Sequence, residues 1–200
     1  MNDEMYEVIN SIYCYKGTDV LKNKLNIHDL DTLSNIERKL VLAKLYELRQ
    51  NKSIGNFDMQ HFKFIHRFLF EDIYDFAGEF RRENIAKDNF RFAEYEYIEQ
   101  ELGRLLNELK KENYLKDLSK KDFVKRIIYY MTELNVLHPF REGNGRTIRE
   151  FIRELEYVNG YIFNLRGMDP NIIMSAMKRS VINSDDLEKI MYKCIDKIDV

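Results

Sequence analysis

The chain has 200 residues, of which 44% are hydrophobic and 33% charged, and this balance excludes a chain that is disordered throughout. Only 2 Pro and 8 Gly occur, so the residues that most often interrupt helices are scarce, which favours a mainly helical protein. The 32 basic and 34 acidic residues give a net charge of −2, which leaves no general field for nucleic acid or anionic lipid.

No repeat, linker or shift in composition divides the chain, so we expect a single domain over residues 1–200. Cys14 and Cys194 lie near opposite ends without the spacing of metal ligands, which argues against a disulfide framework or a zinc site. The N-terminus is acidic rather than basic and apolar, and no apolar run is long enough to cross a membrane. The sequence therefore predicts a cytoplasmic protein, with secretion as the alternative.

The first strong periodic segment covers residues 57–76 and predicts one core helix. His61 and His66 fall within it, but a spacing of five does not place them on one helical face, so a structural or surface role is expected for both. The apolar residues recur at three- and four-residue steps, at Phe62, Ile65, Phe68, Leu69, Ile73 and Phe76.

The pattern changes over residues 79–93, where apolar and basic residues flank a polar Lys87-Asp88-Asn89. This arrangement resembles a short hairpin with a polar turn, although an ordinary surface connection is the simpler interpretation of the segment alone. Helical periodicity resumes at Tyr97 and again from about Lys121.

The second of these helices should end near His138, because a residue that precedes a proline is pushed out of the helical region. A further amphipathic run then continues to Asn159 and Gly160. At its start, Gly143 and Gly145 flank Asn144 and allow the backbone N–H groups to converge where the helix dipole favours negative charge. The pattern predicts a binding site for an anion.

The side chains around this turn suit phosphate chemistry. Arg146 and Arg149 lie on the same side of the helix and can donate to phosphate oxygens. Glu142 offers the hard oxygen that Mg²⁺ prefers, and His138 can accept a proton near neutral pH. A lone histidine or a lone Gly-Asn-Gly turn is more often structural, but together these residues indicate phosphoryl or nucleotidyl transfer.

Residues 138–149 read His-Pro-Phe-Arg-Glu-Gly-Asn-Gly-Arg-Thr-Ile-Arg. This segment resembles the signature H-P-F-x-(D/E)-G-N-G-R-x-x-R of the Fic (Fido) family and matches every specified position. Residues 17–24, 66–70 and 74–81 are similar to flanking segments of its bacterial toxin and effector branch. The resemblance implies a mainly α fold: a Fic-type helical core at about 57–196 with a short β-hairpin flap, preceded by a helical extension at about 1–56.

The resemblance also implies a function, the transfer of AMP from ATP to a Tyr, Thr or Ser hydroxyl of a target protein. In that reaction His138 would take the proton of the hydroxyl, and Glu142 would hold Mg²⁺ against the phosphates. The anion hole would consist of Gly143, Asn144 and Gly145, while Arg146 and Arg149 would bind the outer phosphates. Phe140 would anchor the loop in the core.

By the same resemblance, the hairpin at 79–93 would be the family's flap, which pairs with an extended target segment by strand addition. This replaces the interpretation as a surface connection. Ile85 and Lys87 are the flap candidates for nucleotide binding, and Lys22 with Asn23 are candidates near the adenosine.

Many family members restrain themselves with a helix that carries (S/T)-x-x-x-E-(G/N). Here only Ser184 and Glu188 have that spacing, and Lys189 stands where Gly or Asn belongs. Because residues 184–196 also have the periodicity of a last core helix, we interpret the match as accidental and expect inhibition by a separate antitoxin-like protein. A degenerate internal helix, or no restraint, is the alternative.

Two other functions fit the same pattern. One is a Fic-fold transferase that moves phosphate or phosphocholine instead of AMP, although the intact Gly-Asn-Gly-Arg run argues against the phosphate-transferring branch. The other is a catalytically silent module that binds a strand with its flap. His138 argues against the second, because a silent module needs no base beside an anion site.

Overall fold

The structure is a computed structural model that describes residues 11–50, 54–87, 90–164 and 183–198, together with 169, 172, 175, 176 and 179. It confirms the mainly helical fold. Its longer helices are α1 (Leu30–Gln50), α2 (Met59–Phe70), α3 (Ile98–Lys111), α4 (Lys120–Leu137), α5 (Asn144–Val158) and α7 (Asp185–Cys194). Two short 3₁₀ turns, η1 (Tyr95–Tyr97) and η2 (Asn113–Leu115), precede and follow α3.

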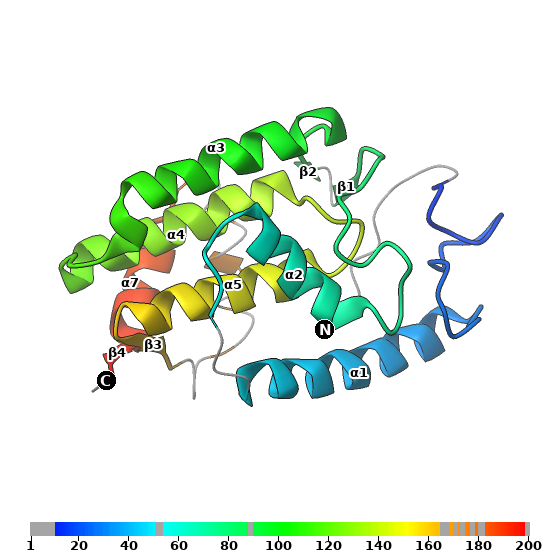
Figure 1. Cartoon of the computed structure of the whole chain (residues 1–200), viewed down its shortest axis with the longest axis horizontal. Helices are drawn as coiled ribbons and strands as arrows, with labels where there is room; N and C mark the ends of the chain where they lie inside the picture. Colours follow the sequence, from blue (N-terminus) through cyan, green and yellow to red (C-terminus); the bar gives the residue numbers. More distant parts are fainter. Residues whose placement is uncertain are drawn as a thin grey trace.

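The helices are arranged around the pair α4 and α5, which contact each other along the middle of the molecule (Figure 1). α3 lies against α4, α2 lies against α5, α7 contacts α4, and α1 contacts α2 on the outer side. The centre is aromatic: Phe62, Phe123, Phe140 and Phe151 are completely buried. Each buried phenylalanine contributes on the order of 2–3 kcal/mol to the free energy of unfolding.

Helix α2 is shorter than the periodicity predicted. Asp58 caps its start by accepting from the His61 N–H, and the preceding Phe57 has a left-handed φ of 55°. After Phe70 the chain makes tight turns in which the Ile73 N–H donates to the Phe70 carbonyl, 2.9 Å away. Ile73 remains fully buried in the turns. The predicted helix over 57–76 is thus wrong at both ends, because core contacts continue the apolar spacing after the helix has stopped.

Helices α4 and α5 agree with the predictions: α4 ends at Leu137 and α5 begins at Asn144. The expected hairpin is also present, as β1 (Ala86–Lys87) pairs antiparallel with β2 (Phe90–Arg91). It lies beside the carboxyl end of α4 (Figure 1).

The carboxyl end of the chain differs from the prediction by two residues. Helix α7 stops at Cys194, and Ile195–Lys197 forms strand β4, which pairs antiparallel with β3 (Tyr161–Phe163). The predicted helix over 184–196 was too long because the buried Ile195 continues the apolar spacing into the strand. Both cysteines are buried and unpaired.

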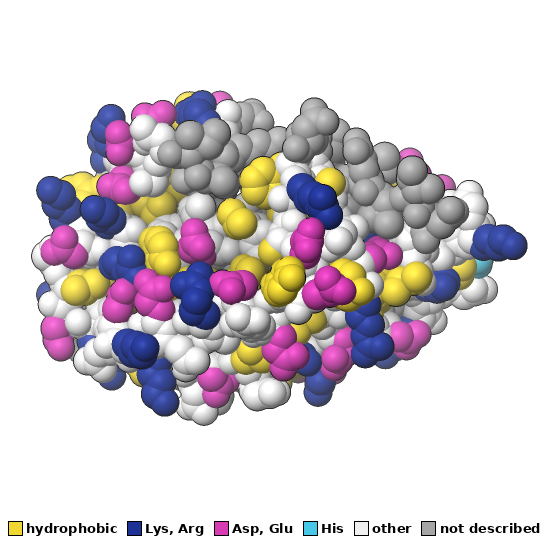
Figure 2. Space-filling view, turned by 90° about the horizontal axis from the view of Figure 1, so that it is seen from above, with side chains coloured by type: hydrophobic (Ala, Val, Ile, Leu, Met, Phe, Trp, Pro, Cys, Tyr) yellow, Lys and Arg dark blue, Asp and Glu magenta, His cyan; other side chains and the backbone are white. Residues whose placement is uncertain are grey.

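The N-terminal extension is helical only in α1 among its described residues. Residues 11–29 form turns with one isolated bridge between Cys14 and Leu21. Basic and acidic side chains are interspersed on the face shown in Figure 2. Within the part of the chain that the structure describes, no helix has the length and apolar character needed to cross a membrane.

Candidate active site

His138 occupies the end of α4, where it is the C-cap with a left-handed φ of 47°. Its Nδ1 lies 3.0 Å from the carbonyl oxygen of Asn135. A carbonyl only accepts, so Nδ1 carries the proton and Nε2 carries the lone pair of the neutral ring. His138 is 3% exposed, and its ring stacks on the Phe92 ring with 3.9 Å between the two ring centroids. This tautomer leaves Nε2 as the proton acceptor.

The loop after His138 is fastened by Asn144. Its Oδ1 accepts from the Phe140 N–H and its Nδ2 donates to the Phe140 carbonyl, both at 2.8 Å. Phe140 is completely buried, as expected, and stacks on His66 with 3.7 Å between ring centroids. The Asn144 side chain therefore shapes the loop, and only its backbone N–H can face a ligand.

Glycines flank the start of α5, where the first backbone amides do not bond within the helix. The first hydrogen bond within α5 runs from Thr147 N–H to the Gly143 carbonyl at 3.1 Å, so the amides of residues 144–146 precede the intrahelical ladder. Gly143 has a φ of 78°, and a β-carbon on it would lie 2.3 Å from the Phe70 ring. Amides at a helix start that lie before the intrahelical ladder favour an anion.

The two arginines of the segment lie in different surroundings. Arg149 is exposed, and its Nη1 would be 3.1 Å from a β-carbon built on Gly145, so the guanidinium lies beside the glycine turn. Arg146 contacts Glu37 and Phe70. Its Nη1 lies 2.6 Å from Glu37, and its guanidinium carbon lies 4.7 Å from the centre of the Phe70 ring.

Glu142 offers carboxylate oxygens, which could ligate a metal, next to the start of α5. Its Oε1 accepts from the Gly143 N–H at 2.8 Å and from Arg146 Nη2 at 3.1 Å, which fixes the carboxylate at the turn. Among the described residues no cluster of three metal-ligating side chains occurs. A single carboxylate beside a phosphate site fits Mg²⁺, which is typically bound through one or two carboxylates and substrate phosphates.

The flap candidates differ in exposure. Ile85 is 2% exposed and packs against Phe92, the residue whose ring stacks on His138. Lys87 lies at the end of β1 and is half-buried, whereas Phe90 and Arg91 on β2 are exposed. Ile85 thus supports Phe92, which in turn contacts His138, and the two residues of β2 face solvent.

Lys22 and Asn23 form hydrogen bonds within the N-terminal segment. Lys22 Nζ donates to the Ile12 carbonyl at 2.9 Å, and the Asn23 amide bonds to Leu21 and Ile27 within its own turn. Neither side chain has a hydrogen bond to residues 138–149 in the described structure. Their place near the adenosine stays a prediction.

Sequence reasoning missed Arg81, which joins the flap to the loop. This side chain is 1% exposed, and its Nε donates to the His138 carbonyl at 2.8 Å. Its other nitrogens donate to the carbonyls of Glu83, Leu137 and Ala93. The only signal was its place at the end of the flanking segment 74–81.

His66 has the structural role that was expected for it, and the structure shows that this role is to support the loop. Its Nδ1 accepts from the Gly78 N–H at 2.8 Å, so Nε2 carries the proton and donates to the Glu142 carbonyl at 2.9 Å. Burial lowers the pKa of His66 to about 3, with a smaller contribution from Arg146. His61 has the structural role expected: its Nε2 lies 3.0 Å from Glu154 of α5.

The pKa of His66 makes stability depend on pH. The unfolded ring takes up a proton below about pH 6.5 while the folded ring does not, so the unfolded state binds more protons. Stability is therefore complete above that pH and falls as the pH drops toward 3. Against His66→Gln, the wild type should lose up to about 1.4 kcal/mol more per pH unit between about pH 6 and about pH 4.

Urea unfolding of both proteins across this range measures the difference. Burial raises the pKa of Glu156 to about 8, which gives a slope of opposite sign in both proteins and cancels in the comparison. Parallel stability curves for the two proteins would contradict the neutral, doubly bonded state of His66.

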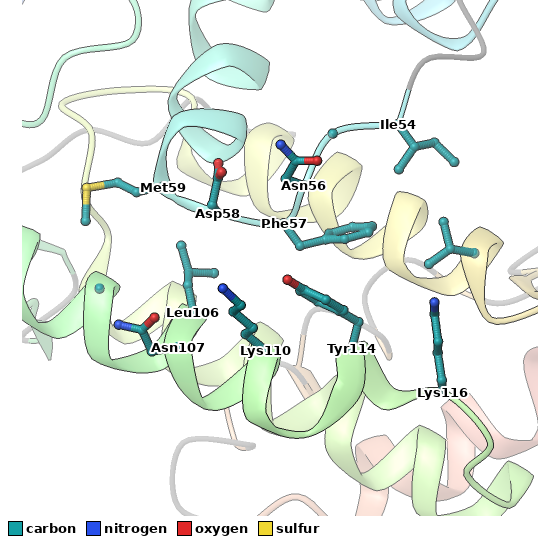
Figure 3. Close-up of a pocket in the computed structure, with 13 residues that line it drawn as sticks. Ile54, Asn56, Phe57, Asp58, Met59, Leu106, Asn107, Lys110, Tyr114 and Lys116 are labelled. Atoms are coloured by element: carbon teal, nitrogen blue, oxygen red, sulfur yellow. The ribbon is translucent and has the colours of Figure 1, made fainter.

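A cavity of about 830 Å³ lies away from this loop, between the segment before α2, the carboxyl half of α3 and the end of α5 (Figure 3). Lys110, Tyr114 and Lys116 line one side and Asn56 with Phe57 the other. It contains neither the histidine nor the glycines and arginines of the loop, so size alone does not identify the reactive site.

Comparison with known proteins shows the family of the chain. The model of the Fic/DOC family matches residues 56–155. The chain is 39% identical over 188 residues to the protein adenylyltransferase VbhT of Bartonella schoenbuchensis, covering 94% of this chain and 39% of that protein. It is 35% identical over 176 residues to the probable protein adenylyltransferase y4lH of Sinorhizobium fredii, covering 88% and 90%. The chain thus spans well under half of the first relative and most of the second.

Solved structures show the same fold over nearly the whole chain. The BepC effector of Bartonella tribocorum, with bound AMPPNP, has a TM-score of 0.86 at 26% identity and covers 94% of this chain and 97% of its own. The N-terminal Fic domain of an effector from Bartonella quintana, with bound ADP, has a TM-score of 0.85 at 25% identity and covers 93% and 95%. Both of these similar proteins are VirB-translocated effectors. The expected helical core with a hairpin is confirmed.

Proposed function

Because the chain belongs to the Fic/DOC family, whose relatives above are protein adenylyltransferases, we propose that it transfers AMP from ATP to a Tyr, Thr or Ser hydroxyl of another protein. Its relationship to these proteins makes it an enzyme of the nucleotidyltransferase class. The observation that carries the proposal is local. The proton-accepting side of His138 at the end of α4 and the amide array at the start of α5 belong to one short, fastened loop.

In the proposed reaction the target hydroxyl oxygen attacks the α-phosphorus of ATP. A new oxygen–phosphorus bond forms, the bond to the bridging oxygen breaks, and pyrophosphate leaves with the electron pair. The hydroxyl proton passes to Nε2 of His138, whose Nδ1–H stays bonded to Asn135. A positioned general base typically contributes about 10²–10⁴-fold to the rate.

The loop would stabilise the charge that develops on the phosphate. Gly143, Asn144 and Gly145 would form the anion hole: the amides of Asn144 and Gly145 would face the phosphate, while Gly143, whose own N–H bonds to Glu142, would permit the turn. The exposed Arg149 would bind the outer phosphates together with Arg146. Glu142 would hold Mg²⁺, which neutralises phosphate charge when bound. We further propose that the target adds a strand along the exposed β2 edge of the 79–93 flap, near Ile85 and Lys87.

The test uses the purified chain, Mg²⁺, a bacterial lysate and ATP labelled in one phosphate at a time. Label in the α-phosphate should appear on protein and label in the γ-phosphate should not, and peptide mass spectrometry should find an added AMP on a hydroxyl side chain. Transfer of the γ-label would indicate phosphate transfer and refute the proposed donor chemistry. Failure of both labels to reach protein, with purified chain that binds ATP, would favour a silent module.

Replacing Arg149 by alanine should weaken ATP binding about tenfold or more, since a charge-assisted bond to phosphate is worth roughly 1.5–3 kcal/mol. Calorimetry with ATP and Mg²⁺ measures the change. Arg104→Ala is the matched control, because Arg104 is an exposed arginine whose ion pairs lie on α3. Equal affinity in the Arg149 variant and the control would remove this residue from the phosphate site.

We also propose that any restraint on the enzyme comes from a separate, antitoxin-like protein. Ser184 Oγ donates to Glu188 Oε1 at 2.6 Å, so this carboxylate is engaged at the start of its own helix. In the described structure Glu188 pairs with no arginine. This contact supports the interpretation that the internal match is accidental.

A further inference from the structure

Glu37 is a buried carboxylate that lies outside the region matched by the family model. It belongs to α1, within the N-terminal extension, and is 6% exposed. Its Oε1 lies 2.6 Å from Arg146 Nη1, and its Oε2 accepts from the Tyr74 hydroxyl. One side chain thus connects the N-terminal helix to the glycine loop.

Arg146 is shared between two carboxylates. Nη1 faces Glu37 at 2.6 Å and Nη2 faces Glu142 at 3.1 Å, while Phe70 covers one face of the guanidinium. Burial alone would lower the pKa of Arg146, but the charges of Glu37 and Glu142 outweigh it and raise that pKa. The arginine is therefore a fixed cation with a defined orientation.

Tyr74 fixes the other oxygen of Glu37. Burial, reinforced by the negative charge of Glu37, raises the pKa of Tyr74, so its hydroxyl remains a donor to the carboxylate. Since both Glu37 oxygens are engaged and the group is buried, the carboxylate has little freedom to move away from Arg146.

We propose that Glu37 is a positioning residue of the nucleotide site, which holds Arg146 so that this arginine and Glu142 keep the geometry that phosphate binding needs. The inference rests on the proposed function and extends it to α1. Without the Glu37 charge, the partly buried cation, whose side chain is 23% exposed, would be left with Glu142 as its one facing carboxylate among the described residues. It would then draw Glu142 away from the turn or shift itself out of place.

A second ion pair of α1 provides a control. It allows an experiment to distinguish the positioning of Arg146 from the attachment of α1 to α5. Arg49, near the end of the same helix, binds Glu150 of α5 at 2.7 Å. Glu150 also binds Arg153 at 2.7 Å and belongs to no part of the loop. Loss of this pair weakens the attachment of α1 without changing the charges around Arg146, so Arg49→Gln is a matched control.

The experiment measures ADP binding by calorimetry, with and without Mg²⁺, in the full chain and three variants. Glu37→Gln should weaken ADP binding about tenfold or more. Tyr74→Phe should weaken it in the same direction by a smaller factor, because the carboxylate stays but loses its donor. Arg49→Gln should bind ADP as the wild type does, even where its thermal midpoint is lower.

Wild-type or tighter affinity in Glu37→Gln would overturn the proposal, and tighter binding would show that Glu37 competes with phosphate for Arg146. An equal loss in Arg49→Gln would also overturn it, since α1 would then act by attachment alone. Should Glu37→Gln fail to fold, unchanged affinity in Tyr74→Phe would be decisive against it. The binding of ADP is measured without any transfer reaction. A chain that binds ADP but modifies no protein therefore refutes the proposed function and leaves this inference standing.

Discussion

Replacing His138 by alanine is expected to lower the rate of AMP transfer by about 10²–10⁴-fold while ATP binding stays close to that of the wild type. In the proposed mechanism the base acts on the incoming hydroxyl, whereas the amides of α5 and the arginines would hold the nucleotide. Because Asn135 fixes the tautomer through Nδ1, the lost group is the Nε2 acceptor. Single-turnover kinetics with a target protein measure the rate of AMP transfer, and calorimetry measures the affinity for ATP, so the two effects are separated.

His28→Ala is the control for this variant, since His28 is exposed and its Nε2 bonds to Asn26 within the N-terminal segment. It should transfer AMP at the wild-type rate. Retained transfer in His138→Ala would remove the base from the mechanism. Equal loss of transfer and of ATP affinity would instead indicate that the histidine supports the loop, for instance through its stacking on Phe92.

The loop could be predicted from sequence because its rules are local. Pro139 ends the preceding helix, the glycines permit the turn, and the next amphipathic run starts immediately. The residue types that phosphate chemistry needs fall within twelve consecutive positions, 138–149. In the structure His138 lies at the end of α4, Glu142 at the turn and Arg149 beside Gly145, while Arg146 lies apart from Arg149 against Glu37. Their roles toward a nucleotide stay predictions.

The residues that support the loop could not be predicted in this way. Glu37 precedes its partner Arg146 by more than a hundred positions, and Arg81 precedes the His138 carbonyl by 57. A buried charge has no periodic signature, and its partner is set only when distant helices meet. For the same reason the helix ending at Phe70 seemed longer, because Ile73 is buried by tertiary contacts and not by a helical turn.

Replacing Gly143 by alanine should both destabilise the fold and abolish ATP binding. At a φ of 78° an L-residue costs roughly 1–2 kcal/mol, and the new methyl would lie 2.3 Å from the Phe70 ring. Overpacking of that kind typically costs a further 1–3 kcal/mol of the free energy of unfolding. The Phe70 ring also packs against the Arg146 guanidinium, so a shifted ring disturbs the arginine as well as the turn.

Gly17→Ala separates the two costs. Gly17 has nearly the same φ, 75°, but a β-carbon there meets nothing within 4 Å. Urea unfolding should therefore show the backbone cost alone in Gly17→Ala and a larger loss in Gly143→Ala. Adding Phe70→Leu to the Gly143 variant should recover part of the difference, because the methyl then has room. Equal destabilisation by the two single variants would show that the close approach of the turn to Phe70 contributes nothing to the loop.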